Sequence, residues 1–142
     1  MGIENTSGEK NLVYFGISKS NRKNFDQEIR IIEDSLKRRN YELLVFVDKY
    51  NFELGQENEM MRIAFEEIDR SKIMITELSK KAIGVGIEIG YAKAKNIPII
   101  YIKKEGEKYS TTAGGCANHI IEYAGAEDLR TQLEKIMEQM NV

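Results

Sequence analysis

Cysteine and histidine each occur only once in this sequence of 142 residues, as Cys116 and His119. A single cysteine excludes an internal disulfide, and one cysteine with one histidine cannot supply the ligands of the usual zinc sites. No run of apolar residues approaches the roughly 18 to 20 that a membrane-spanning helix needs. We therefore expect no metal site and no membrane segment.

Charge of neither sign dominates the sequence. It has 21 basic and 23 acidic residues, for a formal net charge of −2 at pH 7, so no nucleic-acid partner is indicated. The N-terminus lacks the basic and apolar regions of a signal peptide, and we expect a cytoplasmic location. The length suits one domain, which we expect at 11–142, after a flexible N-terminal segment at 1–10.

Short apolar runs alternate along the sequence with segments whose apolar residues recur at helical spacing. Strands that alternate with helices form a parallel sheet with helices on both faces. The sequence therefore predicts a single-domain α/β fold, with a doubly wound, flavodoxin-like sheet of five parallel strands. The expected strands are 11–17, 41–47, 72–78, 96–102 and 119–123, and the expected helices are 25–40, about 61–70, 87–95 and the C-terminal segment.

The loops that follow the predicted strands contain the most unusual residues of the sequence. SKSN follows the first strand, Asp48 the second, AIGVG the third and YSTTAGG the fourth. In doubly wound sheets, ligands bind at the carboxyl ends of the strands, where the strand order reverses. These loops therefore indicate a small-molecule site at that edge.

Glu88 follows the AIGVG run at the expected start of a helix. Helix-end amides would keep its carboxylate anionic, and Gly84 and Gly86 would leave room for a ligand beside it. An exposed carboxylate of this kind can attack an electrophilic carbon, such as the anomeric carbon of a sugar. The structural alternative is a glutamate that caps the helix after a tight turn. A dinucleotide fingerprint is not indicated, because Ile89 stands where its third glycine would be.

The run ITELSKKAIGVGIEIGYAKAKNIPIIYI, residues 75–102, closely resembles the nucleoside 2-deoxyribosyltransferase superfamily. It is most similar to the 2′-deoxynucleoside 5′-phosphate N-hydrolase branch, and the resemblance places Glu88 on the catalytic nucleophile of that family. YFGISKS, residues 14–20, resembles the family's first strand, whose tyrosine and following polar loop contact sugar and phosphate. KYSTTAGG, residues 108–115, resembles the loop whose serine, here Ser110, reaches the phosphate site of a neighbouring subunit.

The resemblance implies hydrolysis or transfer at the N-glycosidic bond of a (deoxy)nucleoside 5′-monophosphate, through a covalent glycosyl-enzyme on Glu88. It implies a small-molecule nucleotide substrate, no metal or organic cofactor, and a homodimer or larger homo-oligomer. Asp48 is a further candidate near base or sugar, with a turn residue as its alternative. Tyr14 could equally be a core residue. Ser110 and Asn118 are ordinary loop residues if the protein is a monomer. The candidate substrate-binding residues are Tyr14, Gly16, Ser18, Lys19, Ser20, Asp48, Ala82, Gly84, Gly86, Ser110 and Asn118.

Two positions depart from the family pattern. The resemblance puts a sugar-binding aspartate at Ala64 and a serine of the glycine loop at Ala82. Asp69 is a poor substitute for the aspartate, because it lies on a different helix face from Ala64. Two other functions therefore stay open, a non-catalytic nucleotide-binding protein and a glycohydrolase acting on NAD or a related signalling nucleotide. The retention of Glu88 beside its glycines favours an enzyme.

Overall fold

Five parallel strands form one sheet in the computed structural model, which describes residues 11–142. The expectation for 1–10 lies outside the described residues. The order is β3-β2-β4-β5-β6, so the chain adds one strand on one side of β2 and the remaining three on the other. The order therefore reverses between β2 and β4, and the predicted doubly wound fold is confirmed. The strands are β2 (Asn11–Gly16), β3 (Tyr41–Val45), β4 (Ser71–Glu77), β5 (Ile99–Lys104) and β6 (His119–Tyr123).

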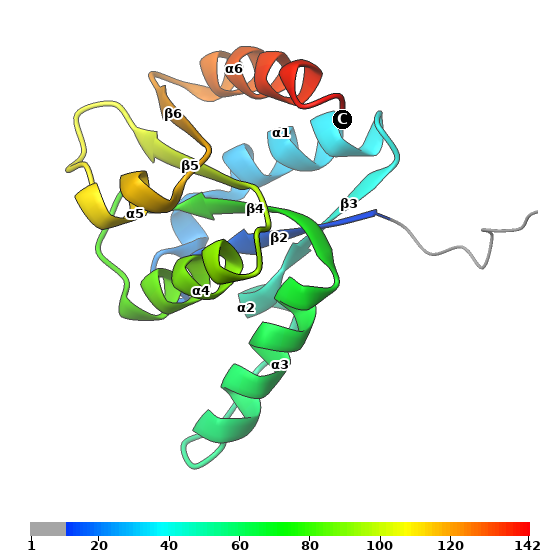
Figure 1. Ribbon diagram of the computed structural model, residues 1–142. Helices are drawn as coiled ribbons and strands as arrows, with labels where there is room; N and C mark the ends of the chain where they lie inside the picture. Colours follow the sequence, from blue (N-terminus) through cyan, green and yellow to red (C-terminus); the bar gives the residue numbers. More distant parts are fainter. Residues whose placement is uncertain (1–10) are drawn as a thin grey trace, which may run out of the picture.

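Helices cover both faces of this sheet (Figure 1). One face carries α1 (Asp26–Lys37) and α6 (Ala126–Gln139), which pack against each other. The opposite face carries α3 (Glu57–Asp69) and α4 (Ile83–Ala94), with the short helices α2 (Phe46–Lys49) and α5 (Thr111–Cys116) beside them. A 3-10 turn, η1 (Arg22–Asn24), precedes α1, and the outer end of α3 projects away from the rest of the structure (Figure 1).

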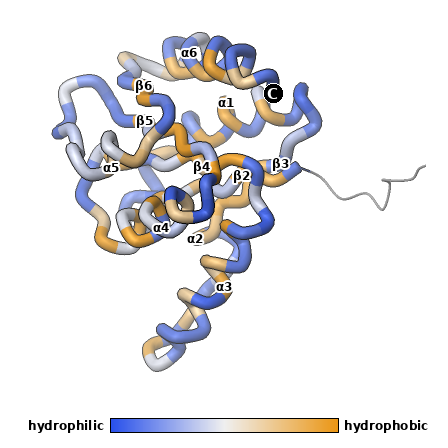
Figure 2. The backbone as a smooth tube through the Cα atoms, in the orientation of Figure 1, coloured by the Kyte–Doolittle hydropathy of each residue, from blue (hydrophilic) through white to orange (hydrophobic). Residues whose placement is uncertain are grey.

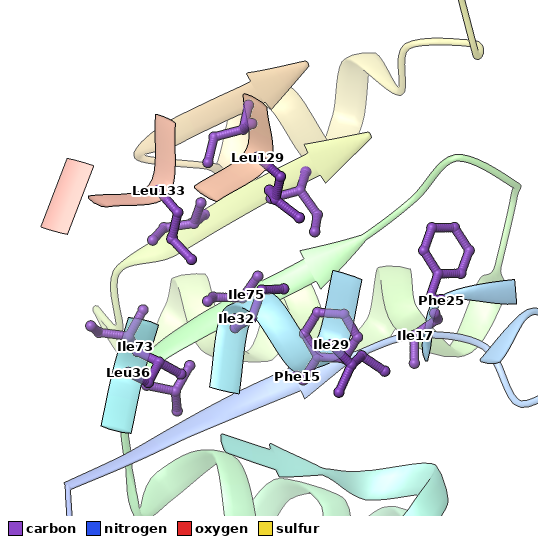
Figure 3. Close-up of a cluster of buried hydrophobic side chains, with 14 of the residues drawn as sticks. Phe15, Ile17, Phe25, Ile29, Ile32, Leu36, Ile73, Ile75, Leu129 and Leu133 are labelled. Carbon is purple, nitrogen blue, oxygen red and sulfur yellow. The ribbon is translucent and has the colours of Figure 1, made fainter. Parts of the chain in front are cut away.

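The core has two layers, because successive residues of a strand point to opposite faces of the sheet. Phe15 and Ile75 pack toward α1 and α6, where they meet Ile32 and Leu129 (Figure 3). Tyr14, the residue before Phe15, points to the other face and lies beneath α2, α3 and α4. The strands at the centre are mostly hydrophobic in Figure 2, whereas much of the projecting α3 is hydrophilic. Tyr14 thus brings a polar hydroxyl to the α3–α4 side of the core.

Two helix starts depart most from the predicted elements: α3 begins at Glu57, about four residues early, and α4 also begins four residues early. The glycines at 84 and 86 suggested a loop up to position 86, but the helix begins at Ile83. Glycine costs a helix about 1 kcal/mol relative to alanine, and the burial of Val85 and Ile89 on the sheet offsets this cost. The other departures are smaller: β3 ends at Val45 and leads into α2, and part of the loop expected at 103–115 forms the end of β5 and α5.

Candidate active site

Tyr14 and Glu88 form a hydrogen-bonded pair on the α3–α4 side of the sheet. The Tyr14 hydroxyl donates to Oε2 of Glu88 at 2.7 Å. Tyr14 is completely buried in β2, next to the switch point between β2 and β4, and Glu88 reaches it from the second turn of α4. Burial, followed by the nearby charge of Glu88, raises the pKa of Tyr14 far above its ordinary value, so the phenol remains a donor. The two residues that the sequence singled out first are therefore in direct contact.

Gly16 provides the space beside this carboxylate. A Cβ at Gly16 would lie 2.9 Å from Cε of Met74 and 3.3 Å from Oε1 of Glu88. The first distance is shorter than side chains tolerate, so a larger residue here would displace the methionine and crowd the carboxylate. Gly16 ends β2, and its carbonyl accepts a hydrogen bond from Oγ1 of Thr76 at 3.3 Å. The oxygen of Glu88 that does not bind Tyr14 thus faces bare backbone.

The ionisation of Glu88 differs from the sequence-based expectation. Because α4 begins at Ile83, Glu88 lies one turn inside the helix, beyond the free amides that were expected to keep it anionic. Its side chain is half-buried, and burial raises its pKa to about 7 against the opposing effect of the Tyr14 hydrogen bond. The expectation of a fully anionic, exposed carboxylate is corrected accordingly. A carboxylate with this pKa exchanges its proton near neutral pH, as groups in catalytic sites often do.

The polar loop after β2 has hydrogen bonds within itself and to the α2–α3 loop. Oγ of Ser18 accepts from the amide of Asn21 at 3.3 Å, and Nζ of Lys19 donates to Oδ1 of Asn51 at 2.9 Å. Lys19 and Ser20 are exposed and Ser18 is half-buried. The loop begins directly after Gly16, the last residue of β2. The hydroxyls of Ser18 and Ser20 and the amine of Lys19 therefore lie at the carboxyl edge of the sheet, where the site was predicted.

Asp48 is engaged by Arg22, a residue that the sequence did not single out. Nε of Arg22 donates to both carboxylate oxygens of Asp48, at 2.9 and 3.0 Å, and its Nη1 binds Asp26 at 2.7 Å. The ion pair joins α2 to η1 across the carboxyl ends of β2 and β3. Asp48 therefore stands at the predicted edge with its charge already paired. The sequence shows Asp26 four residues after Arg22, but the contact of Arg22 with Asp48 depends on the tertiary fold and could not be found from the sequence.

An aromatic group next to Tyr14 was also missed. The ring of Phe46 lies 6.0 Å from that of Tyr14, and Phe52 stacks on both Phe46 and Tyr50, at 6.0 and 5.9 Å. Phe46 is buried, whereas Tyr50 and Phe52 are half-buried. The three aromatic residues in FVDKYNF, at the end of a predicted strand and just after it, are the signal that could have found this group.

The start of α4 places Ala82, Gly84 and Gly86 in its first turn. Ala82 is the N-cap, and its methyl group cannot accept a hydrogen bond from the helix amides. No atom stands within 4 Å of where a Cβ would lie on Gly84 or on Gly86. The packing of this chain therefore does not require glycine at either position.

A cavity of about 610 Å³ lies between the β4–α4 loop, α4 and α5. Ala82, Gly86 and Ser110 line it, together with Lys80, Lys81 and Lys108. Glu88 is not part of its lining, since the side chain is roughly 200° around the helix from Gly86 and points toward β2. The predicted residues thus divide between two flanks of α4, with Tyr14, Gly16 and Glu88 on the β2 side and Ala82, Gly86 and Ser110 on the α5 side.

Ser110 and Asn118 have structural partners within the chain. Oγ of Ser110 accepts from the amide of Ala113 at 3.2 Å and so caps α5. Oδ1 of Asn118 accepts from the amide of Ile99 at 2.8 Å, at the amino ends of β5 and β6. The fold does not bring either residue to the Glu88 of its own chain.

Neither a membrane-spanning helix nor a cluster of metal ligands is found among the described residues. No helix within 11–142 combines the length and apolar character of a membrane span. In the same range, no three His, Cys, Asp or Glu side chains are grouped as metal ligands would be.

Known structures with the same arrangement include enzymes that act on nucleosides or nucleotides. A CMP N-glycosidase from Clostridium botulinum matches with a TM-score of 0.64 and 19% identity, over 87% of this chain and 99% of its own. A 2-deoxyribosyltransferase from Bacillus psychrosaccharolyticus matches with a TM-score of 0.65 and 11% identity, over 84% and 90%. A conserved protein from Enterococcus faecalis V583 has a TM-score of 0.68 and 15% identity, over 90% and 99%. This chain has the 2-deoxyribosyltransferase fold.

The resemblance predicted from the sequence is thus confirmed at the level of the fold, and the N-hydrolase branch stays a prediction. No protein-family model matches the chain, and no curated protein matches it significantly. Within the 2-deoxyribosyltransferase fold of this chain, Ala64 is completely buried in the layer that contains Tyr14. Asp69 binds the hydroxyl of Tyr91 at 2.9 Å instead of replacing the missing aspartate. Asp69 therefore does not replace the aspartate that the resemblance expects at Ala64, and Ala82 lacks the hydroxyl of the expected serine.

Proposed function

We propose that this protein cleaves or transfers the N-glycosidic bond of a (deoxy)nucleoside 5′-monophosphate, with Glu88 as the nucleophile. The observation that carries the proposal is the Tyr14–Glu88 pair at the switch point of the sheet. It is supported by the fold, which this chain shares with a CMP N-glycosidase and a 2-deoxyribosyltransferase. The branch and the substrate are part of the proposal.

In the proposed reaction, Oε1 of ionised Glu88 attacks C1′ of the sugar while the bond from C1′ to the base nitrogen breaks. Tyr14 holds Oε2, which leaves Oε1 on the side of Gly16. The base leaves with the bonding electrons and is protonated. Water then attacks C1′ and releases the sugar phosphate and the Glu88 carboxylate, or a second base takes the place of water.

The 5′-phosphate is assigned to the loop after β2 and to the start of α4. Ser18, Lys19 and Ser20 offer hydroxyls and an amine at the carboxyl end of β2, and Gly84 leaves the first-turn amides of α4 uncovered. Helix N-termini and hydroxyl groups are suited to phosphate. The aromatic rings of Phe46, Tyr50 and Phe52 offer stacking surfaces for a base on the same side of the sheet.

The working unit in this proposal is a homodimer in which Ser110 serves the neighbouring site. Ser110 and Glu88 lie on opposite flanks of α4, so one chain cannot bring them together. The outer surface of α4 is apolar and uncovered, with Ile83 86% and Ile87 50% exposed. Tyr109, next to Ser110, is 46% exposed. A second copy on this surface would bury these side chains and deliver its own Ser110.

The test is a panel of CMP, dCMP, other ribo- and deoxyribonucleoside monophosphates, the matching nucleosides and NAD, with released base measured by chromatography. We expect base release from one or more monophosphates, faster than from the corresponding free nucleosides. Release of nicotinamide from NAD alone would favour the signalling-nucleotide alternative. Saturable binding of a monophosphate without any base release would favour a non-catalytic binding protein.

A further inference from the structure

Glu77 is a buried carboxylate that the proposed reaction does not use. It ends β4, eleven residues before Glu88, and only 2% of its surface is exposed. It points to the α1–α6 side of the sheet, away from the Tyr14–Glu88 pair. A buried carboxylate is costly unless it is hydrogen-bonded, so its partners indicate what it does.

Ser79 donates every hydrogen bond that the Glu77 side chain accepts within residues 11–142. The amide of Ser79 lies 3.1 Å from each carboxylate oxygen, and its hydroxyl donates to Oε2. Oγ of Ser79 in turn accepts from the amide of Lys104 at 3.0 Å. Ser79 therefore joins Glu77 to the end of β5, and the amide of Leu78 adds a direct bond to the carbonyl of Ile102 at 3.2 Å.

No side-chain cap fixes the start of α4, as is also true of α1, α3 and α6. Ser110 caps α5 with its own hydroxyl, but the N-cap of α4 is Ala82. Three residues separate Ser79 from the first residue of α4, so the Ser79 contacts are the nearest fixed point before the helix. The position of α4 along the sheet decides whether Glu88 meets Tyr14.

We propose that Glu77 is a positioning residue which, through Ser79, fixes the start of α4 and so holds Glu88 against Tyr14. The structural part of this inference stands on the contacts alone, and its catalytic part rests on the proposed function. An ionised Glu77 can accept all three hydrogen bonds from Ser79, whereas a protonated one loses an acceptor and gains a donor.

The surroundings of Glu77 make this clamp sensitive to pH. Burial raises the pKa of Glu77 to about 7, while the hydrogen bonds from Ser79 and the charge of Lys104 oppose the rise and the charge of Glu28 adds to it. Nζ of Lys104 lies 3.8 Å from Oε2 of Glu28, and the hydroxyl of Tyr123 donates to the same oxygen at 3.1 Å. If α4 moves while β4 stays packed, Glu77 remains buried and loses the Ser79 donors that favour its ionised form, so its pKa is higher in that open state than in the closed one. The closed clamp is therefore favoured as pH rises above 7 and weakened below it.

Amide hydrogen exchange on the full chain tests the inference without any substrate. Glu88→Gln is the background in every exchange experiment, because Glu88 itself lies on α4 with a pKa of about 7 and would otherwise titrate in the same range. After correction for intrinsic rates, peptides covering 79–94 should be about tenfold better protected at pH 8 than at pH 6, as expected for the loss of charged hydrogen bonds. Glu77→Gln should abolish this difference and leave the peptides poorly protected at both values. Ser79→Ala should do the same, which provides a second variant if Glu77→Gln does not fold. The α6 peptides serve as the reference for the global fold.

Glu28→Gln is the matched control, because Glu28 is a second buried glutamate in this cluster with no hydrogen bond to Ser79. It should keep the pH dependence and move its midpoint to lower pH, since removing the charge of Glu28 lowers the pKa of Glu77. Where the wild type releases base, Glu77→Gln should lower kcat about tenfold, because Glu88 is less often in place. Protection of 79–94 that is equal at pH 6 and pH 8, or unchanged by Glu77→Gln, overturns the inference. An inactive wild type with the predicted exchange would overturn only the proposed function.

Discussion

The hydroxyl of Tyr14 donates to Oε2 of Glu88 across 2.7 Å and so joins residues that lie 74 positions apart in the sequence. The contact joins β2, which contains Tyr14, to α4, which contains Glu88. It also leaves Oε1 of Glu88 next to Gly16, where there is no side chain. Tyr14 thereby orients one oxygen of the carboxylate, and the other lies against Gly16.

Replacement of Tyr14 by phenylalanine tests the value of that hydrogen bond. Tyr14→Phe keeps the buried ring and removes only the donor to Glu88, so the pKa of Glu88 should rise further. A hydrogen bond to a charged group contributes about 1.5–3 kcal/mol, which predicts a roughly 10- to 100-fold lower rate at pH 7. The pH–rate profile should show its acid limb displaced to higher pH. An acid limb at the wild-type position would show that the phenol does not tune this carboxylate.

The raised pKa of Glu88 predicts that this side chain destabilises the folded protein above neutral pH. Its pKa is about 7 in the folded chain and 4.5 by reference, so the stability it contributes is present below pH 4.5 and lost as pH rises through 7. Urea unfolding should therefore show Glu88→Gln to be more stable than the wild type at pH 8, by up to roughly 3 kcal/mol. The difference should shrink at pH 5. Glu67 does not disturb this comparison, because hydrogen bonds outweigh its burial and lower its pKa to about 2.

Gly84 offers a test that separates stability from ligand binding. A Cβ at this position meets nothing within 4 Å, so Gly84→Ala should stabilise α4 by about 0.5–1 kcal/mol. The same methyl group would stand over the first-turn amides assigned to phosphate, and KM for the monophosphate should rise. Thermal melting and steady-state kinetics measure the two effects. Gly125→Ala, at an uncrowded glycine before α6, is the control and should leave KM unchanged.

Mixed oligomers test whether Ser110 serves a neighbouring subunit. Ser110→Asp keeps a capping oxygen for α5 and places a negative charge where the phosphate is expected. Glu88→Ala and Ser110→Asp should each be inactive, and equal mixing should restore about a quarter of the wild-type activity as subunits exchange. The exchange itself is followed with differently tagged chains. Mixed dimers that stay inactive, or a chain that sediments as a monomer, would contradict the assignment of Ser110.

The sheet could be predicted from the sequence because its strands are continuous apolar runs. Runs such as NLVYFG are buried on both faces of the sheet, and this property appears directly in the residue pattern. The start of α4 could not be predicted, since Gly84 and Gly86 favour a loop locally and only the burial of Val85 and Ile89 makes the helix stable there. The short helices α2 and α5 have too few residues to show a period.

The candidate site was predictable in its residues and not in its contacts. Tyr14 and Gly16 could be identified from the sequence through the family resemblance, and Glu88 through that resemblance and its neighbouring glycines. That Tyr14 binds Glu88, that Arg22 occupies Asp48 and that Glu77 binds Ser79 all depend on how the elements pack. The ionisation of Glu88 was mispredicted for the same reason, because burial is a property of the assembled structure.

The most direct test of the account is to stop the reaction during turnover and search for a covalent sugar on the protein. Wild-type protein should be mixed with a monophosphate whose base it releases, quenched in acid within the first turnovers and mapped by peptide mass spectrometry. We predict a sugar-phosphate adduct on the peptide containing Glu88. Glu88→Gln should show no adduct and should turn over at least ~10³-fold more slowly. Near wild-type base release by Glu88→Gln, or an adduct on another residue, would contradict the account.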